Sequence, residues 1–193
     1  MLAEGTVDVR RADLSEVVPG AESLLSAAEL ARADRFRFAH DRRRWLRARA
    51  RLRMLLGDYL DIDPRAVRLT TGEHGKPRLA GDEQLFFNVS HAGDLALFAF
   101  ASRDVGVDVE LPRPAVDVMA VAERTFGRSE AERLKSLDPA EREREFLRAW
   151  VRHEAALKCR GSGIGGEVDE SGLRVTELDV GPKAAAAVAI SLY

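Results

Sequence analysis

The stretch Gly106-Val107-Asp108-Val109-Glu110 sets what to expect of the second half of the chain, because apolar and acidic residues alternate in it. Successive side chains of a β-strand point to opposite faces, so the valines share one face and the carboxylates share the other. Two neighbouring carboxylates suit a hard divalent cation, and Mg²⁺ is usually held by one or two carboxylates together with substrate phosphates. The stretch therefore predicts a strand with an acidic face that can bind a metal ion.

A long helix is expected to bring a third carboxylate to this strand. Phe146, Trp150, Glu154 and Lys158 are spaced four apart, so they lie along one slowly turning stripe of a helix. One interpretation of the Glu154–Lys158 pair is an ordinary surface ion pair, worth about 0.2–0.5 kcal/mol. The strand carboxylates favour the other interpretation, a three-carboxylate metal site. We therefore expect a Mg²⁺-dependent enzyme that acts on a phosphate-bearing substrate.

Composition limits the class of protein. The chain has 193 residues, which is enough for one compact domain or two small lobes. With 46% hydrophobic and 32% charged residues it is expected to be globular and not disordered. Cys159 is the only cysteine, which excludes an intramolecular disulfide and a cysteine-based metal cluster. No signal peptide and no apolar run of about 18 residues is found, so we expect a soluble, cytoplasmic protein.

Arginine is concentrated in one segment. Ten arginines lie between Arg32 and Arg53, against only Asp34 and Asp41. Such a block favours contact with a polyanion or an acidic protein surface, although a solvated helical face is the ordinary alternative. A nucleic-acid surface is disfavoured, because the block lacks aromatic interleaving and a helix-turn-helix pattern, and the net charge is only −2.

The remaining pattern predicts short strands between helices. Ser26 with Glu29 has the spacing of a capping box and predicts a helix start. The expected strands are Thr6–Arg10, Val67–Leu69, Leu85–Ser90, Leu95–Ser102, Val105–Glu110, Leu173–Asp179 and Ala185–Ser191, the third and fourth paired as a hairpin. Further helices are expected over Trp45–Leu60, near Val116–Arg124, from a cap at Ser129, and over Ala140–Arg160 up to Gly161 and Gly163.

Two segments of the chain resemble each other. Trp45–Arg53 matches Trp150–Lys158 at the Trp, Arg, Ala and Leu positions, with near matches at two more. This echo predicts an α+β protein made of two similar lobes, 1–103 and 104–193, each a small sheet on a long helix, with the metal ligands in the second.

Two polar turns leave alternatives open. Asn88–His91 (Asn-Val-Ser-His) ends a strand, and its side chains either bond the local backbone or line a phosphate site. Gly75–Pro77 (Gly-Lys-Pro) is either a solvated turn or the site of one functional cation. It is not a Walker-type loop, because the required glycine spacing and the Ser or Thr after the lysine are missing.

Taken in order, these motifs resemble one family. The ordered set is Gly75-Lys76-Pro77, Phe87-Asn88-Val89-Ser90-His91, Gly106–Glu110, Trp150–Lys158 and Gly161-Ser162-Gly163-Ile164, and the resemblance that it carries covers about residues 29 to 164. It is similar to the Sfp-type 4′-phosphopantetheinyl transferases. The resemblance implies a pseudo-two-fold pair of α/β lobes that holds coenzyme A. It also implies transfer of the phosphopantetheine arm to a carrier-protein serine, with release of adenosine 3′,5′-bisphosphate.

The resemblance also implies roles for individual residues. The Mg²⁺ ligands would be Asp108, Glu110 and Glu154. The catalytic residues would be Asp108, Glu154 as base, either directly or through a bound water, and Lys158, which would offset charge on the leaving phosphate or protonate it. Coenzyme A would be bound by Arg44, Lys76, Pro77, Ser90, His91 and Lys158. The implied partner is an acyl, peptidyl or polyketide carrier protein, as in polyketide and nonribosomal peptide biosynthesis, and the chain is expected to be a monomer.

The chain departs from the family pattern at His153. The family often has Lys directly before the helix glutamate, where this chain has His153, which could add pH sensitivity or simply face solvent. The alternative is a pseudoenzyme that binds coenzyme A or a carrier without transfer. If a carrier docks, Arg47, Arg49 and Arg51 are expected to steer its acidic helices.

Overall fold

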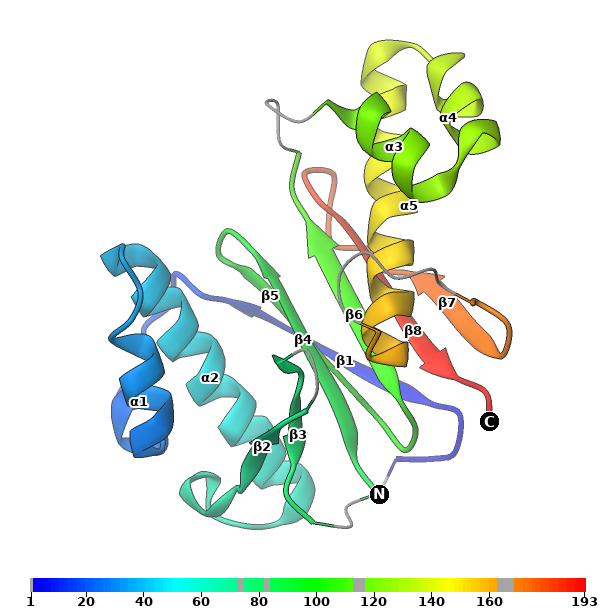
Figure 1. The fold of residues 1–193 in the computed structure, drawn as a ribbon. Coiled ribbons are helices and arrows are strands. Elements are labelled where there is room, and N and C mark those ends of the chain that lie inside the picture. Colours follow the sequence, from blue (N-terminus) through cyan, green and yellow to red (C-terminus); the bar gives the residue numbers. More distant parts are fainter. Residues whose placement is uncertain (1, 73–74, 82–83, 113–116, 163–168) are drawn as a thin grey trace.

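The computed structural model describes the chain apart from residues 1, 73–74, 82–83, 113–116 and 163–168 (Figure 1). Its strands are β1 (Val7–Asp13), β2 (Leu69–Thr71), β3 (Pro77–Leu79), β4 (Phe86–Ala92), β5 (Leu95–Ala101), β6 (Val105–Glu110), β7 (Leu173–Glu177) and β8 (Ala185–Ser191). Its helices are α1 (Ala27–Ala33), α2 (Ala39–Leu60), α3 (Val118–Phe126), α4 (Arg128–Lys135) and α5 (Pro139–Arg160), with 3₁₀ turns η1 (Ala21–Leu24) and η2 (Pro64–Ala66). The predicted α+β class is confirmed.

The two halves of the chain share one topology. In each half a strand precedes a long helix, two antiparallel strands of the same sheet follow, and the last strand lies in the middle of that sheet; the N-terminal half adds the separate two-stranded sheet β2-β3 after its helix. The resulting strand orders are β1-β5-β4 and β6-β8-β7. Helices α2 and α5, which contain the two similar segments, are each 22 residues long. This correspondence is the pseudo-two-fold arrangement that the sequence predicts.

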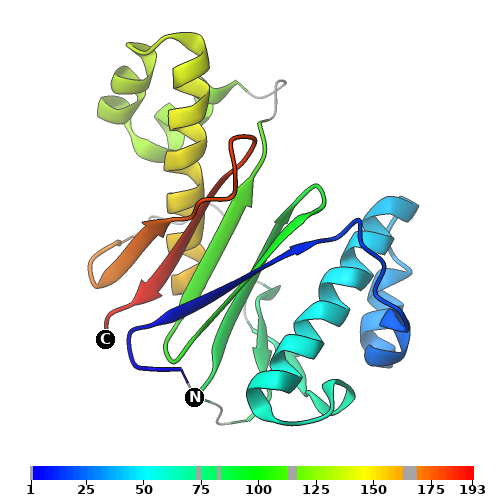
Figure 2. The ribbon, with the colours of Figure 1, turned by 180° about the vertical axis from the view of Figure 1, so that it is seen from behind.

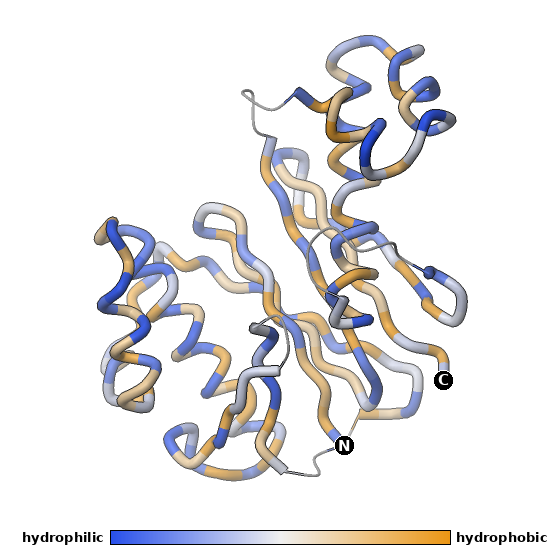
Figure 3. Tube along the Cα trace, viewed as in Figure 1, coloured by the Kyte–Doolittle hydropathy of each residue, from blue (hydrophilic) through white to orange (hydrophobic). Residues whose placement is uncertain are grey.

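The two sheets pack against each other between the long helices (Figures 1 and 2). Leu97 and Ala99 of β5 share a buried cluster with Val107 and Val109 of β6 and Val188 of β8. Figure 3 shows hydrophobic positions running along these central strands. Because this apolar cluster draws on both halves, the burial that stabilises one half depends on the other.

Each long helix covers the outer face of its own sheet. Phe98 and Phe100 of β5 are fully buried in a cluster with Leu52 and Leu56 of α2. On the other side, Val151 of α5 and its neighbours pack on β7 and β8. The alternation of each strand thus serves two cores, one between the sheets and one under a helix.

Helix α5 begins and ends at residues suited to its termini. The Asp138 side chain accepts hydrogen bonds from the N–H groups of Ala140 and Glu141, and Pro139 occupies the first turn. Gly161 ends the helix with φ 73°, a left-handed conformation that glycine adopts without strain. Gly163 and Ile164 lie outside the described residues.

Three local predictions are wrong. Helix α2 begins at Ala39 and not at the predicted Trp45. The cap predicted at Ser129 is replaced by Gly127, whose φ of 81° turns the chain into α4 at Arg128. The strand predicted over Val67–Leu69 lies further along as β2, because pairing with β3 sets Leu69 opposite Leu79. The expected Val105–Glu110 strand is confirmed with the same bounds, and β4 and β5 form the predicted hairpin.

The arginines of α2 bind acceptors within the chain. Arg47 Nη1 donates to the carbonyl oxygens of Leu14 at 2.7 Å and Ser15 at 2.8 Å. Arg51 Nη2 donates to a Glu16 carboxylate oxygen at 2.8 Å. These guanidinium groups therefore fasten the segment after β1 to the helix.

A buried triad holds α1 on α2. Glu29 is 7% exposed and accepts hydrogen bonds from Arg49 Nε at 2.5 Å and Arg53 Nε at 2.8 Å. The capping box predicted at Ser26 is confirmed, since the Ser26 and Glu29 side chains each accept the other's N–H. Arg49 and Arg51 each pair with a carboxylate of the chain, whereas Arg47 binds backbone carbonyl groups, so the expectation that these three arginines steer a carrier protein stays a prediction.

Candidate active site

Gly106 allows helix α5 to lie directly against strand β6. A Cβ atom at this position would stand 2.1 Å from the carbonyl oxygen of Ala155, a distance that no real side chain reaches. Residues two apart on a strand share a face, so Asp108 points to the same helix, at the turns that carry Glu154 and Lys158. The close approach of the two backbones thus brings the predicted acidic and basic groups together.

Asp108 is the centre of a buried polar cluster. It is 3% exposed, and its Oδ1 accepts hydrogen bonds from the Ser90 hydroxyl at 2.8 Å and from the Lys158 ammonium. Lys158 Nζ also lies 3.3 Å from Ser90 Oγ. Asp108 Oδ2 is buried as well and has no hydrogen-bond partner within the described part of the chain. Lys158 therefore pairs with Asp108, in place of the surface pair with Glu154 that one interpretation expected.

Glu154 completes the acidic face of the site. Its side chain is buried, and burial raises the pKa of its carboxyl group. The charge of Lys158 opposes this shift, whereas the charges of Asp108 and Glu110 add to it. The three carboxylates are therefore close enough to influence one another, as the sequence predicts.

The side chains around Asp108 are the candidate ligands for the predicted Mg²⁺ ion. Within the described ranges, no group of three or more His, Cys, Asp or Glu side chains is arranged to hold a metal ion as it stands. A buried carboxylate oxygen without a partner, Asp108 Oδ2, nonetheless lies in a cluster of mutually interacting acids. Carboxylate oxygens are the ligands that Mg²⁺ prefers, so the residues present fit this ion.

Lys76 joins the two halves of the molecule. Its ammonium donates to the carbonyl oxygens of Val105 at 3.0 Å and Lys158 at 2.7 Å, and burial lowers its pKa. The solvated-turn interpretation of this lysine is thus wrong. Pro77 follows as the first residue of β3, opposite Thr71. Lys76 thus ties the end of α5 to the N-terminal half.

Arg44 and His91 lie near the cluster on the N-terminal side. Arg44 binds Asp94 through two hydrogen bonds, Nε to Oδ1 at 2.7 Å and Nη2 to Oδ2 at 3.2 Å. The His91 side chain is exposed on β4, next along the strand from Ser90. Desolvation by neighbouring protein lowers the His91 pKa, and the positive charges of Lys158 and Arg44 lower it further. An imidazole whose protonated form is disfavoured therefore faces solvent beside the basic groups.

His153 packs among aromatic rings. Its ring lies edge-on to Phe126, with centroids 5.7 Å apart, and 6.4 Å from the ring of Trp150. Burial lowers its pKa. The residue that departs from the family pattern is therefore part of the packing between α3 and α5 and does not stand in open solvent.

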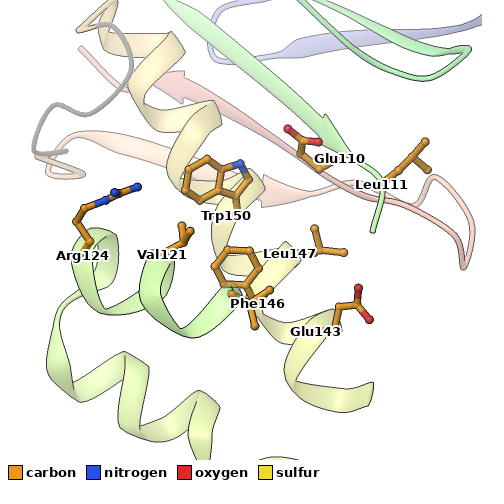
Figure 4. Close-up of a pocket in the computed structure, with 9 residues that line it drawn as sticks. Glu110, Leu111, Val121, Arg124, Glu143, Phe146, Leu147 and Trp150 are labelled. Carbon is orange, nitrogen blue, oxygen red and sulfur yellow. The ribbon is translucent and has the colours of Figure 1, made fainter. Parts of the chain in front are cut away.

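An apolar pocket of about 170 Å³ opens beside Glu110 (Figure 4). Side chains of α3 and α5 form its walls, and Glu110 lies at the end of β6 where the pocket begins. Val118, Val121, Phe146, Leu147 and Trp150 line it together with Leu111, and Arg124 and Glu143 add charges. The acidic site thus has an apolar compartment next to it.

Asn88 is a site residue that the sequence prediction passed over. Its Oδ1 accepts a hydrogen bond from the Val107 N–H at 2.9 Å. It appeared only within the quoted motif, with backbone bonding as one of two open interpretations. It is the only asparagine in the chain, and this is the one sequence feature that could have drawn attention to it.

Two family models match consecutive segments of the chain. Residues 15–103 match the family model described as "4′-phosphopantetheinyl transferase, N-terminal", and residues 104–190 match that of the "4′-phosphopantetheinyl transferase superfamily". The chain belongs to the 4′-phosphopantetheinyl transferase superfamily.

Three relatives show how far the similarity extends. The transferase HetI of Nostoc sp. is 42% identical over 72% of this chain and 61% of its own length. The transferase AcpT of Escherichia coli is 36% identical over 75% of this chain and 72% of its own. The transferase Sfp of Bacillus subtilis is 28% identical over 79% and 67%. The chain thus spans less than two thirds of HetI. None of the described helices combines the length and apolar character needed to cross a bilayer.

Proposed function

We propose that this chain transfers the phosphopantetheine arm of coenzyme A to a serine hydroxyl of a carrier protein. The main support is the buried cluster around Asp108, which places a cation and two acids at one point in a chain of this family. In the reaction a bond forms between the serine oxygen and phosphorus while the pyrophosphate P–O bond breaks. The serine proton leaves to a base, and adenosine 3′,5′-bisphosphate is released.

Glu154 is proposed as that base. Burial raises its pKa, which brings its proton affinity closer to what a general base needs at neutral pH. Lys158 holds the opposite role, because its ammonium stands at Asp108 and can offset charge on the leaving phosphate. The base and the cation come from successive turns of α5, so one rigid helix fixes their separation.

Asp108, Glu110 and Glu154 are proposed to hold Mg²⁺. When bound, the ion would neutralise the pyrophosphate and polarise the phosphorus under attack. Asp108 would offer its unpartnered Oδ2, while its Oδ1 stays with Ser90 and Lys158. This division lets one carboxylate serve the ion and keep the ammonium in place.

The proposed coenzyme A contacts come mainly from the N-terminal half. His91 is exposed beside Ser90 and supplies a donor or acceptor for a phosphate oxygen. Arg44 would share its charge between Asp94 and the 3′-phosphate. Lys76 and Pro77 would support the adenine end, with Lys76 acting through the backbone that it braces.

The pocket beside Glu110 is proposed to receive the apolar part of the arm, the geminal dimethyl group next to its phosphate. At about 170 Å³ the pocket is smaller than the roughly 300–1,000 Å³ of a whole-ligand site, so it suits a fragment of coenzyme A. Its location beside Glu110, a proposed metal ligand, supports this assignment (Figure 4).

Filling this pocket tests the assignment. Val121→Phe should raise the KM for coenzyme A about tenfold, because two buried methyl groups are worth about 0.8 kcal/mol each. The matched control is Val17→Phe, since Val17 is 71% exposed and remote from the pocket lining. An unchanged KM in Val121→Phe would remove the arm from this pocket.

The acceptor is proposed to be an acyl, peptidyl or polyketide carrier protein. We place the reaction in the cytoplasm and expect a monomer, because the chain holds both halves of the site. The test is the mass of an apo carrier protein incubated with the enzyme, coenzyme A and Mg²⁺. Transfer adds one phosphopantetheine arm to the carrier. Coenzyme A binding without any gain of mass would instead support the binding-only alternative.

A further inference from the structure

Strand β6 is an edge strand, and its open side is closed by side chains of β4. In the order β6-β8-β7 it has a strand neighbour on one side only. Backbone N–H groups on such an open side need other partners when they are buried. Asn88 Oδ1 accepts from Val107 N–H at 2.9 Å, and Ser90 Oγ accepts from Val109 N–H at 3.4 Å. The Asn88 and Ser90 side chains thus accept the hydrogen bonds that a neighbouring strand would otherwise accept from β6.

Asn88 is suited to this task by its position and its chemistry. It is 5% exposed, and its neighbours Phe87 and Val89 pack in the cluster of the opposite face, against α2. Alternation along β4 therefore turns Asn88 toward β6. Its bond with the Val107 amide is the shorter of the two, and Asn88 belongs to none of the catalytic or binding roles proposed above.

We propose that Asn88 is a positioning residue for the metal site, acting through the Val107 amide. Val107 directly precedes Asp108, so a shift of this amide moves the strand that carries Asp108 and Glu110. This inference rests on the proposed Mg²⁺ site. Partners that orient metal ligands without touching the ion typically contribute about 10–100-fold to metal affinity or activity.

Three variants separate positioning from simple stability. Asn88→Leu keeps the shape but removes the acceptor, whereas Asn88→Asp keeps an oxygen in the same place. Val89→Ala is the matched control, because it weakens the same strand on its other face. Calorimetric titration of each protein with Mg²⁺ in the presence of coenzyme A gives the dissociation constant, and transfer assays give kcat and KM.

We expect Asn88→Leu to weaken Mg²⁺ binding about 10-fold or more and to lower kcat, with the KM for coenzyme A at saturating Mg²⁺ within about twofold. Asn88→Asp should restore Mg²⁺ binding to within about threefold, and Val89→Ala should bind Mg²⁺ as the wild type does. Equal Mg²⁺ affinity in Asn88→Leu, or an equal loss in Val89→Ala, would overturn the proposal. Failure of the wild type itself to bind Mg²⁺ would overturn the proposed metal site as well.

Hydrogen exchange provides a test without substitution. The Val107 amide of the wild-type protein should exchange as slowly as the β6 amides paired with β8, because Asn88 occupies it. Fast exchange of this one amide, within an otherwise protected strand, would contradict the bond. This measurement stays decisive if Asn88→Leu does not fold.

Discussion

Among single residues, Asp108 is unusual because its two carboxylate oxygens lie in different environments. One oxygen is held by Ser90 and Lys158, and the other is buried without a partner in the described structure. A buried acceptor without a hydrogen bond costs about 1–3 kcal/mol, so the chain maintains it at the expense of stability. A ligand that supplies positive charge at Oδ2 would remove this cost, which is why the site is interpreted as a place for a cation.

Replacing Asp108 by Asn should separate activity from folding. The amide keeps the size of the side chain but cannot offer two anionic oxygens, so transfer should fall by at least about 100-fold. Unfolding in urea, compared with that of the exposed Asp58→Asn control, should show a protein that still folds cooperatively. Turnover in Mg²⁺ near the wild-type rate would remove Asp108 from the mechanism.

How much of the site the sequence predicts depends on the range of each interaction. Alternation correctly puts Asp108 and Glu110 on one face of β6, and helical spacing puts Glu154 and Lys158 on one stripe of α5, because these rules act within one strand or one helix. The partners of Arg44 and Lys76 could not be predicted, because Asp94 and the end of α5 lie far away in the chain. For the same reason the sequence does not show that the Lys76 ammonium binds backbone carbonyl groups instead of solvent.

At the scale of elements, the contact between β6 and α5 sets the geometry of the site. Gly106→Ala would place a methyl group within 2.1 Å of Ala155 O, so the helix must move. The overpacking should cost about 1–3 kcal/mol of unfolding free energy. A shift of about 1 Å in Glu154 and Lys158 should lower kcat roughly 100-fold.

The control for this prediction is Gly127→Ala. Gly127 has a positive φ, 81°, and a Cβ there meets nothing within 4 Å. It should therefore cost stability, about 1–2 kcal/mol, without the loss of kcat. If Gly106→Ala and Gly127→Ala lowered kcat to the same extent, the close approach would not be what positions the catalytic groups.

The triad that joins α1 to α2 predicts a pH dependence of stability. Burial opposes ionisation of Glu29, but hydrogen bonds from Ser26, Arg49 and Arg53 outweigh it and lower the Glu29 pKa. Stability from this group is present above the unfolded-state pKa of about 4.3 and is lost as the pH falls through the lower folded value. Glu29→Gln should cost about 3–5 kcal/mol at pH 7, because two arginines lose their buried partner.

Urea unfolding at several pH values measures this difference. The gap between wild type and Glu29→Gln should narrow as the pH falls below about 4.3. Glu22→Gln breaks a pair with Arg42 that is largely exposed and should cost under about 1 kcal/mol. A gap that stays constant down to pH 3 would show that the Glu29 carboxylate is not the stabilising group.

Prediction of elements succeeded where periodicity was strong and failed at short connections. Strand β6 and the end of α5 at Gly161 follow from alternation and from a glycine C-cap. The predicted start of α4 was wrong. Ser129 has the side chain of a typical helix cap, whereas Gly127 turns the chain by its backbone conformation alone. The α2 arginines were expected to contact a polyanion or an acidic protein surface, because sequence spacing does not show that Glu29 reaches Arg49 and Arg53.

At the scale of the whole molecule, the two halves share an apolar interface. Leu97 and Ala99 from one sheet are buried with Val107, Val109 and Val188 from the other. Lys76 adds a polar link, since its ammonium binds carbonyl groups of the C-terminal half. The proposed lobes 1–103 and 104–193 are thus topologically similar but not independent.

This interface predicts one cooperative unfolding transition for the intact chain. Fragments 1–103 and 104–193 would each expose half of a buried apolar cluster, so neither should show cooperative unfolding alone. Scanning calorimetry of the chain and of both fragments checks this. Two resolved transitions, or a fragment with a cooperative transition of its own, would show that the halves are separate folding units.

Asp108, Glu110 and Glu154 are proposed to bind one divalent ion at the pyrophosphate of coenzyme A. The most direct test of this proposal is a crystal structure with coenzyme A and Mn²⁺ in place of Mg²⁺, read from the anomalous signal of manganese. We predict one peak within about 2–2.5 Å of oxygens from all three carboxylates. A peak bound elsewhere, or no peak between β6 and α5 in crystals that contain coenzyme A, would contradict the account.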